Sequence, residues 1–335
     1  MYFSTPVDKS QPLDDRSSTG RRQPWAEHRA GTDILAFAYE GIDESKAVRL
    51  RGCAPRLFYT VVNEDGTKRI KLHTAWFCRV RLCPVCQWRR SLKVYGQAAE
   101  IVRAANAKTP DGYGWIMLTL TMRNVEGKLL SAAIDKMGRS WHRLLKLDAW
   151  KKAVLGTMRS LEVTHNTDPA SPSYDTYHPH YHVLLCVDLK YFKSRHYLSR
   201  DAWAALWQRA LRVDYKPQVW VSRVKGNTAA AIAEVAKYAS KPGDYIIPED
   251  IDAMLSAVQV LDKALNRRRL VGWTGLLKEI HAELQLDDTE NGDLVHTDIA
   301  PDEDAAAAEH IQIAYSWLRQ ERNYFKERER DNGET

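Results

Sequence analysis

The chain has 335 residues, 44% of them hydrophobic, which is enough for one large domain or two ordinary ones with a sizeable core. Its net charge of +6 is a mild bias toward a polyanionic partner, and the lack of any run of about 18 apolar residues argues against a membrane span. The N-terminus lacks the charged-then-apolar layout of a signal peptide. These features predict a cytoplasmic protein whose five cysteines are thiols or metal ligands.

The first 30 residues are polar and rich in Ser, Arg, Asp and Pro, a composition that predicts a disordered N-terminus. Residues 31–110 hold four of the five cysteines, in two groups separated by a hairpin-like stretch with Asp65-Gly66 at its turn. Two such groups of thiolates suit a structural, tetrahedral zinc ion. The predicted zinc ligands are Cys53, Cys78, Cys83 and Cys86. His73 in place of Cys53, or four reduced cysteines without metal, are the alternatives.

The segment 79–93 is basic, contains no acidic residue and has a tryptophan among its cations. This composition fits contacts to DNA phosphates with one stacking platform, and a solvated basic helix face is the alternative. The residues predicted to bind DNA here are Arg79, Arg81, Trp88, Arg89 and Arg90.

Residues 111–245 carry a regular series of elements. Short apolar runs predict four strands, at 115–122, 158–164, 180–187 and 219–224, and helical spacing predicts helices at 127–147, 199–212 and 228–241. The order is β-α-β-β-α-β-α, and its first six elements match the ferredoxin-like split unit. The predicted fold class is therefore α+β, with an antiparallel sheet covered by helices.

Side chains along a strand alternate between faces, and this alternation predicts a metal site. Tyr181 and its apolar neighbours should face the covering helices, which leaves His180, His182 and Glu162 to converge on the other face. Two imidazoles and a carboxylate suit Mn²⁺ or Mg²⁺. The alternative is that both histidines are ordinary polar residues. Cys186, in the same strand, is predicted to be a core thiol.

On the helix predicted at 228–241, Glu234 and Tyr238 are four residues apart and would share one face. Tyr238 could attack phosphorus and Glu234 could serve as a general base, with Lys237 and Lys241 beside them to bind the DNA backbone. A surface helix with a Glu–Lys pair and a half-buried tyrosine is the alternative.

The C-terminal third is predicted to consist of three parts. Residues 246–286 show helical spacing, 287–303 form a polar, acidic linker, and 304–335 contain a charged amphipathic helix. The apolar stripe of that last helix would be Ile311, Ala314, Leu318 and Phe325.

Three segments, in this order, resemble the motifs of plasmid rolling-circle replication initiators of the HUH endonuclease superfamily, in the family typified by the plasmids pUB110 and pC194. They are the strand WIMLTLTMRN (115–124), the histidine–hydrophobic–histidine element HPHYHVLL (178–185) and the tyrosine element EVAKYASK (234–241). The resemblance covers roughly residues 50–285.

The resemblance implies specific roles. His180 and His182 would be metal ligands, Tyr238 the nicking nucleophile and Glu234 the base for a later hydrolytic step, while Glu162 as third ligand rests on the face argument. His178 would act indirectly at most. The protein would act in a bacterial cytoplasm. It would cut one strand of origin DNA, keep the 5′-phosphate as phosphotyrosine and leave a 3′-OH for a host polymerase.

Other readings of the same motifs remain. The tail helix would pair two subunits into a homodimer or dock a host helicase or polymerase. A single-strand transposase or relaxase of the same superfamily is the nearest rival function. A zinc-containing DNA-binding repressor without catalysis is a rival of another class, and a metallohydrolase is disfavoured because the chain has no H-E-x-x-H helix.

Overall fold

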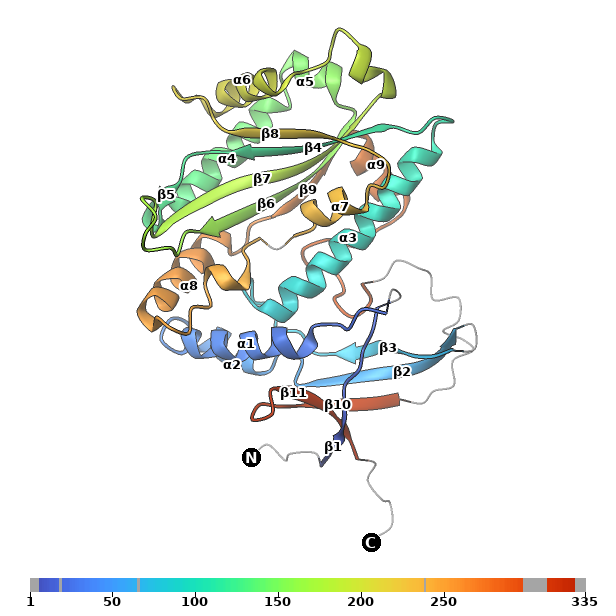
Figure 1. Cartoon of the computed structure of the whole chain (residues 1–335), viewed down its shortest axis with the longest axis vertical. Helices are drawn as coiled ribbons and strands as arrows, with labels where there is room; N and C mark the ends of the chain where they lie inside the picture. Colours follow the sequence, from blue (N-terminus) through green and yellow to red (C-terminus); the bar gives the residue numbers. More distant parts are fainter. Residues whose placement is uncertain (1–5, 18–19, 65–66, 238, 298–311, 329–335) are drawn as a thin grey trace. The chain divides into compact units, whose positions relative to one another are not determined.

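The computed structural model of the chain describes residues 6–17, 20–64, 67–237, 239–297 and 312–328. They form two compact units, residues 1–89 with 293–335 and residues 90–292, and the division falls inside one long helix. Both units combine helices with antiparallel sheets, which confirms the predicted α+β class (Figure 1). Among the described helices, none joins the length and the apolar character that crossing a bilayer requires.

The first unit is built on a five-stranded sheet in the order β1-β11-β10-β2-β3. Its elements are β1 Val7–Pro12, α1 Trp25–Glu40, α2 Glu44–Arg51, β2 Arg56–Glu64, β3 Thr67–Ala75, the start of α3 Pro84–Ala107, β10 Gln312–Leu318 and β11 Asn323–Glu327. The predicted hairpin is present as β2 and β3, which pair up to Glu64 and Thr67, while its turn at 65–66 lies outside the described residues.

Both chain ends belong to this unit, and two predictions are therefore wrong. The N-terminal region is ordered where it is described: β1 pairs with β11, and Trp25 is fully buried against Trp88. The C-terminal region forms strands instead of an amphipathic helix, because β10 lies between β2 and β11 and hydrogen-bonds to both. The partner strands β2 and β1 lie more than 200 residues away in sequence from β10 and β11, and local spacing carries no information about them.

The second unit holds the elements predicted for residues 111–245. Its sheet has the order β8-β4-β7-β6-β9, with β5 paired to β7. The elements are β4 Gly114–Thr121, β5 Val125–Glu126, η1 Gly127–Leu129, α4 Leu130–Leu144, α5 Asp148–Ala153, β6 Gly156–His165, β7 Thr176–Val187, η2 Leu189–Lys193, α6 Arg200–Leu211, β8 Val219–Val224, α7 Ala229–Val235, η3 Pro242–Asp244, α8 Ile251–Leu265, β9 Val271–Thr274 and α9 Gly275–Glu283.

The β-α-β-β-α-β order of β4, α4, β6, β7, α6 and β8 is as predicted. Residues 246–286 are only partly helical, because Val271–Thr274 pairs with β6 as strand β9. The segment 287–303 is also more than a linker where it is described: Lys93 forms an ion pair with Asp287, and the Glu290 carboxylate accepts the Leu270 N–H at 2.6 Å.

Opposite faces of this sheet have different coverings. Tyr181 and the other apolar side chains of β7 on its side pack on α4 and α6, where the Tyr181 ring lies 5.9 Å from Trp141 and 6.4 Å from Trp207. This confirms the predicted buried face. Part of the other face is covered by α3, α7 and α9 (Figure 1). There Leu184 and Cys186 pack among buried side chains of these helices. Cys186 is a buried core thiol, as predicted.

The tail strands should contribute strongly to stability. Tyr324 on β11 is completely buried, and its hydroxyl donates to the Ala54 carbonyl at 2.7 Å. We expect Tyr324→Ala to destabilise the first unit by about 3–5 kcal/mol, and Tyr324→Phe by about 1–3 kcal/mol because one buried carbonyl loses its donor. Urea denaturation measures this, with Tyr197→Ala, an exposed tyrosine, as the control. Equal midpoints for Tyr324→Ala and the control would contradict the strand assignment.

Candidate active site and cysteine cluster

The pairing of β6 with β7 brings three polar side chains together on one face of the sheet. Glu162 lies directly opposite His180, and Ser160 lies opposite His182. Residue 181 points the other way, so both histidines share the face of Glu162. One ligand atom from each of Glu162, His180 and His182 lies within 4.8 Å of the others, and all three side chains are buried. The structure therefore brings together the residues that the face argument selected.

The distances in this cluster suit a divalent cation. His182 Nε2 lies 2.8 Å from Glu162 Oε2 and 3.1 Å from His180 Nε2, and His180 Nε2 lies 3.5 Å from the same carboxylate oxygen. Adjacent ligand atoms around an ion at about 2.1 Å are separated by about 3 Å in octahedral geometry. The three residues thus fit Mn²⁺ or Mg²⁺ both in chemistry and in spacing.

A backbone carbonyl fixes the orientation of one imidazole. His180 Nδ1 lies 3.0 Å from the His178 carbonyl oxygen. Because a carbonyl only accepts hydrogen bonds, Nδ1 carries the proton, and in the neutral ring the lone pair is on Nε2, which faces the cluster. His178 therefore acts on the site through its backbone, which the sequence did not predict.

Charge in the cluster favours an ionised carboxylate. Burial alone would raise the pKa of Glu162, but the interactions of its carboxylate with His180 and His182 outweigh burial and hold the pKa well below its usual range. Lys241, predicted to bind DNA, places its Nζ 3.7 Å from Glu162 Oε1 and is more than half exposed. Its charge therefore lies at the border between the cluster and solvent.

Glu234 approaches the cluster from α7. Its Oε1 lies 3.7 Å from His182 Nδ1, too far for a hydrogen bond, and its other oxygen pairs with Lys237. His182 Nδ1 is buried and forms no hydrogen bond within the described residues. Glu234 is therefore positioned beside the cluster without being one of the three grouped ligands.

The segment after α7 differs from the prediction. The helix was expected to continue to residue 241, but it ends at Val235, and the Val163 N–H donates to the Ala239 carbonyl at 2.8 Å. A single backbone hydrogen bond to β6 thus lies where the last turns of the helix were predicted, and Pro242 disfavours helix at Lys241. The prediction of helix after Val235 is therefore wrong for residues 236–237 and 239–241. Tyr238 itself lies outside the described residues.

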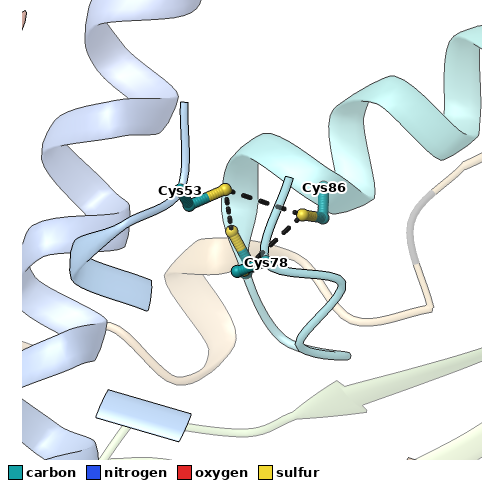
Figure 2. A group of neighbouring side chains, drawn as sticks. Cys53, Cys78 and Cys86 are labelled. Atoms are coloured by element: carbon teal, nitrogen blue, oxygen red, sulfur yellow. Dashed lines mark hydrogen bonds between the residues drawn. The ribbon is translucent and has the colours of Figure 1, made fainter. Parts of the chain in front are cut away.

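The four predicted zinc ligands also meet. Cys53 follows α2, Cys78 precedes α3, and Cys86 is in its first turn, with their sulfurs pointing toward one another (Figure 2). The Sγ atoms of Cys53 and Cys86 are 3.7 Å apart, those of Cys78 and Cys86 3.6 Å, and those of Cys83 and Cys53 3.6 Å. A zinc ion with Zn–S bonds of about 2.3 Å requires sulfurs about 3.8 Å apart. The cluster therefore fits tetrahedral zinc, and His73 is not among its grouped residues.

Burial and hydrogen bonding act differently on the pKa values of these cysteines. Burial raises the pKa of Cys53 and Cys78 well above the usual value. At Cys83 burial acts in the same direction, but hydrogen bonds from the neighbouring thiols outweigh it and lower the pKa. A metal ion entering the cluster would displace the remaining thiol protons, as zinc sites require.

Only some side chains of the basic segment 79–93 are exposed to solvent. Trp88 and Arg89 are each about 5% exposed. Trp88 packs against Trp25 and His28, and Arg89 donates to the Leu294 and Val295 carbonyls. The prediction that these two residues contact DNA is therefore wrong in this structure, because they belong to the interior.

The remaining basic residues of that segment differ from one another in exposure. Arg79 is exposed, whereas Arg81 and Arg90 are partly buried. Trp76, three residues before Arg79, is 73% exposed and is the accessible tryptophan of this region. Nothing in the sequence indicated that Trp76 would be exposed and Trp88 buried.

The fold and the histidine–carboxylate cluster define an α+β protein with three side chains on one face of an antiparallel sheet that are suited to hold a metal ion. Residues 69–325 match the model of a family described as Replication protein. The chain belongs to this family.

Relatives support the same assignment over almost the whole chain. It is 39% identical to a "Protein rep" of Bacillus amyloliquefaciens, over 93% of this chain and 96% of that protein. It is 37% identical to a "Protein rep" of Streptococcus pneumoniae, over 93% and 94%, and 36% identical to a "Replication protein" of Staphylococcus aureus, over 69% and 98%. No solved structure matched the chain.

The cysteine cluster gives a direct test. We expect the purified protein to carry one zinc ion and Cys86→Ser to lose it, because three thiols no longer close the tetrahedron. Elemental analysis by mass spectrometry measures the ratio of zinc to protein. Cys186→Ala removes a buried thiol outside the cluster and should keep the ion. A full zinc content in Cys86→Ser would contradict the assignment.

The second cluster predicts a separate metal affinity. In the zinc-loaded protein, Glu162→Gln should weaken Mn²⁺ binding at least about 10-fold, since even partners outside the ligand set change affinity about 10–100-fold. Electron paramagnetic resonance of free Mn²⁺ measures this. Asp175→Asn is the matched control, because Asp175 pairs with His165 at 3.0 Å outside the cluster. An unchanged affinity in Glu162→Gln would remove Glu162 from the ligand set.

Proposed function

We propose that this chain starts rolling-circle replication of a plasmid by nicking one strand at the origin, with Tyr238 as the nucleophile. Membership of the Replication protein family supports the biological role. The observation that carries the chemistry is the buried cluster of Glu162, His180 and His182, beside which the chain flanking position 238 is tied to β6 through Ala239.

The proposed reaction is a transesterification, in which the phosphodiester bond is exchanged for a phosphotyrosine bond and is not hydrolysed. The phenolic oxygen of Tyr238 attacks the scissile phosphorus, an O–P bond to tyrosine forms, and the bond from phosphorus to the 3′-oxygen breaks. The phenol gives up its proton, and the departing 3′-oxygen gains one. The 5′-phosphate remains on the protein, and the free 3′-OH is available to a host polymerase.

The chain's own residues would position the reactants. Glu162, His180 and His182 would hold a divalent cation, which when bound neutralises charge on the phosphate oxygens. Lys237 and Lys241 are both partly exposed cations beside the cluster and would bind the flanking phosphates. Glu234 is 37% exposed, so it can take a proton from Tyr238 or from the water that later hydrolyses the same phosphate.

The wider architecture fits the HUH endonuclease resemblance. The sheet order β8-β4-β7-β6 and the histidine pair on its central strand β7 are consistent with such a core. The cysteine cluster would supply a zinc-stabilised module beside it in sequence. Origin DNA, single-stranded or in a hairpin loop, is the proposed substrate, because an in-line attack is difficult inside a duplex. Docking of a host helicase or polymerase and formation of a homodimer remain predictions from the sequence.

Two rival functions make different predictions. A transposase or relaxase of the same superfamily would use the same cluster at other DNA ends, and the relatives named above, all replication proteins, favour initiation. A repressor without catalysis would bind DNA and form no covalent adduct.

The proposal predicts that Tyr238→Phe abolishes nicking and adduct formation and leaves DNA binding largely intact, because only one hydroxyl is lost. Supercoiled plasmid carrying the origin is incubated with Mn²⁺ and followed by gel electrophoresis, and mass spectrometry detects the nucleotide-linked peptide. The expected loss is at least about 1,000-fold in rate, as for removal of other covalent nucleophiles.

The matched control is Tyr245→Phe, a buried tyrosine seven residues further on. Nicking that persists in Tyr238→Phe and disappears in Tyr245→Phe would move the nucleophile. Cleavage that continues unchanged in EDTA would remove the metal from the reaction, and DNA binding without any adduct in the wild-type protein would favour the repressor.

A further inference from the structure

Trp220 is an unusual residue on the sheet of the second unit. It lies on the edge strand β8 and is 65% exposed, whereas Val219 beside it is buried. Its nearest neighbours on the same face of the strand are Gln218 and Ser222, both polar and exposed. A lone indole among polar groups does not form the broad apolar patch typical of protein–protein contacts. This surface is better suited to a flat ligand that stacks.

The strand registers align Trp220 with the metal cluster. Thr119 of β4 pairs with Trp220 on one side and with His182 on the other. Directly paired residues in an antiparallel sheet point to the same face, so Trp220 and His182 share the face of the candidate active site. They are two strands apart, which corresponds to about 10 Å across the sheet.

A cation from the other side of the sheet holds the indole. Arg200, the first residue of α6, lies with its guanidinium 5.5 Å from the centre of the Trp220 ring, and its Nε donates to the Val219 carbonyl at 2.9 Å. Ser199 caps the same helix by accepting the Ala202 N–H. The ring is therefore backed by a fixed positive charge and keeps most of its surface accessible to solvent.

A second cation lies just beyond the end of β4, four residues after Thr119. Arg123 follows β4, is exposed, and stacks its guanidinium 4.0 Å from the centre of the Tyr215 ring. An aromatic platform with cations around it is the combination by which proteins bind single-stranded DNA without reading its sequence. The nearby Asp201 is neutralised by Lys216 at 2.7 Å.

We propose that Trp220 is the platform on which one base of the single-stranded substrate stacks, close to the scissile phosphate. At about 3.4 Å per stacked nucleotide, a separation of about 10 Å places that base roughly three nucleotides from the phosphate at the cluster. This proposal rests on the proposed nicking function for its position along the DNA. Trp220 is a binding residue that orients the strand, and it takes no part in the bond changes.

The test combines a protein change with a DNA change. A set of single-stranded origin oligonucleotides carries one abasic nucleotide each, at successive positions around the nick site. In the wild-type protein we expect one position near the nick to lower kcat/KM about 5- to 150-fold, the range found for loss of one base–aromatic stack. Trp220→Ala should cleave the intact oligonucleotide slower by a similar factor and be insensitive to that abasic position, and Trp220→Phe should restore most of both.

The control is Trp76→Ala, an exposed tryptophan of the first unit, which should keep the abasic profile of the wild type. If Trp220→Ala cleaves the intact oligonucleotide at the wild-type rate, or keeps the same abasic profile, the platform is wrong while nicking stands. Binding of a fluorescein-labelled oligothymidylate of about 15 nucleotides, followed by anisotropy, needs no cleavage. A weaker affinity in Trp220→Ala supports the platform even if the wild type cuts nothing, and an equal affinity overturns it.

Discussion

The register between β6 and β7 is the constraint on which the candidate active site depends. It sets Glu162 opposite His180 and leaves His182 two residue pairs further along, on the same face, so that three ligand atoms meet. A shift of one residue would turn both imidazoles into the apolar layer beneath α4 and α6 and bring Tyr181 to the cluster. The apolar contacts of Tyr181 with Trp141 and Trp207 oppose that shift. Packing on one face of the sheet thus maintains the chemistry on the other.

Burial of this cluster would be unfavourable without compensation. Three polar side chains lie almost out of contact with solvent on a sheet, and unpaired groups in such a position cost several kcal/mol. The two imidazoles and the carboxylate satisfy one another in part, and Lys241 adds a positive charge at the border. His182 Nδ1 still has no hydrogen bond among the described residues. A bound cation would let His182 use one nitrogen as a ligand, and a small movement of Glu234 would then satisfy the other.

Local pattern predicted the second unit well and the first unit poorly, for a physical reason. The strands from β4 to β8 lie on a core of their own, so the alternation of Tyr181 with His180 and His182 records directly which face is buried. In the first unit β10 and β11 complete a sheet whose other strands lie near the N-terminus. The apolar residues of the tail happened to fit a helical stripe, and only their distant partners decide otherwise. Trp88 shows the same effect, because Trp25 buries it and the surrounding arginines suggested a surface.

The early end of α7 changes how the residues on either side of position 238 are held. If the helix had continued to residue 241, as predicted, helical geometry alone would have set the position of residue 238 relative to Glu234. Instead the helix ends at Val235, and the Ala239 carbonyl accepts one hydrogen bond from the N–H of Val163, the neighbour of Glu162. Lys237 is held on the other side by its ion pair with Glu234. The residues flanking position 238 are therefore anchored to the helix and to the strand that carries the proposed metal ligand.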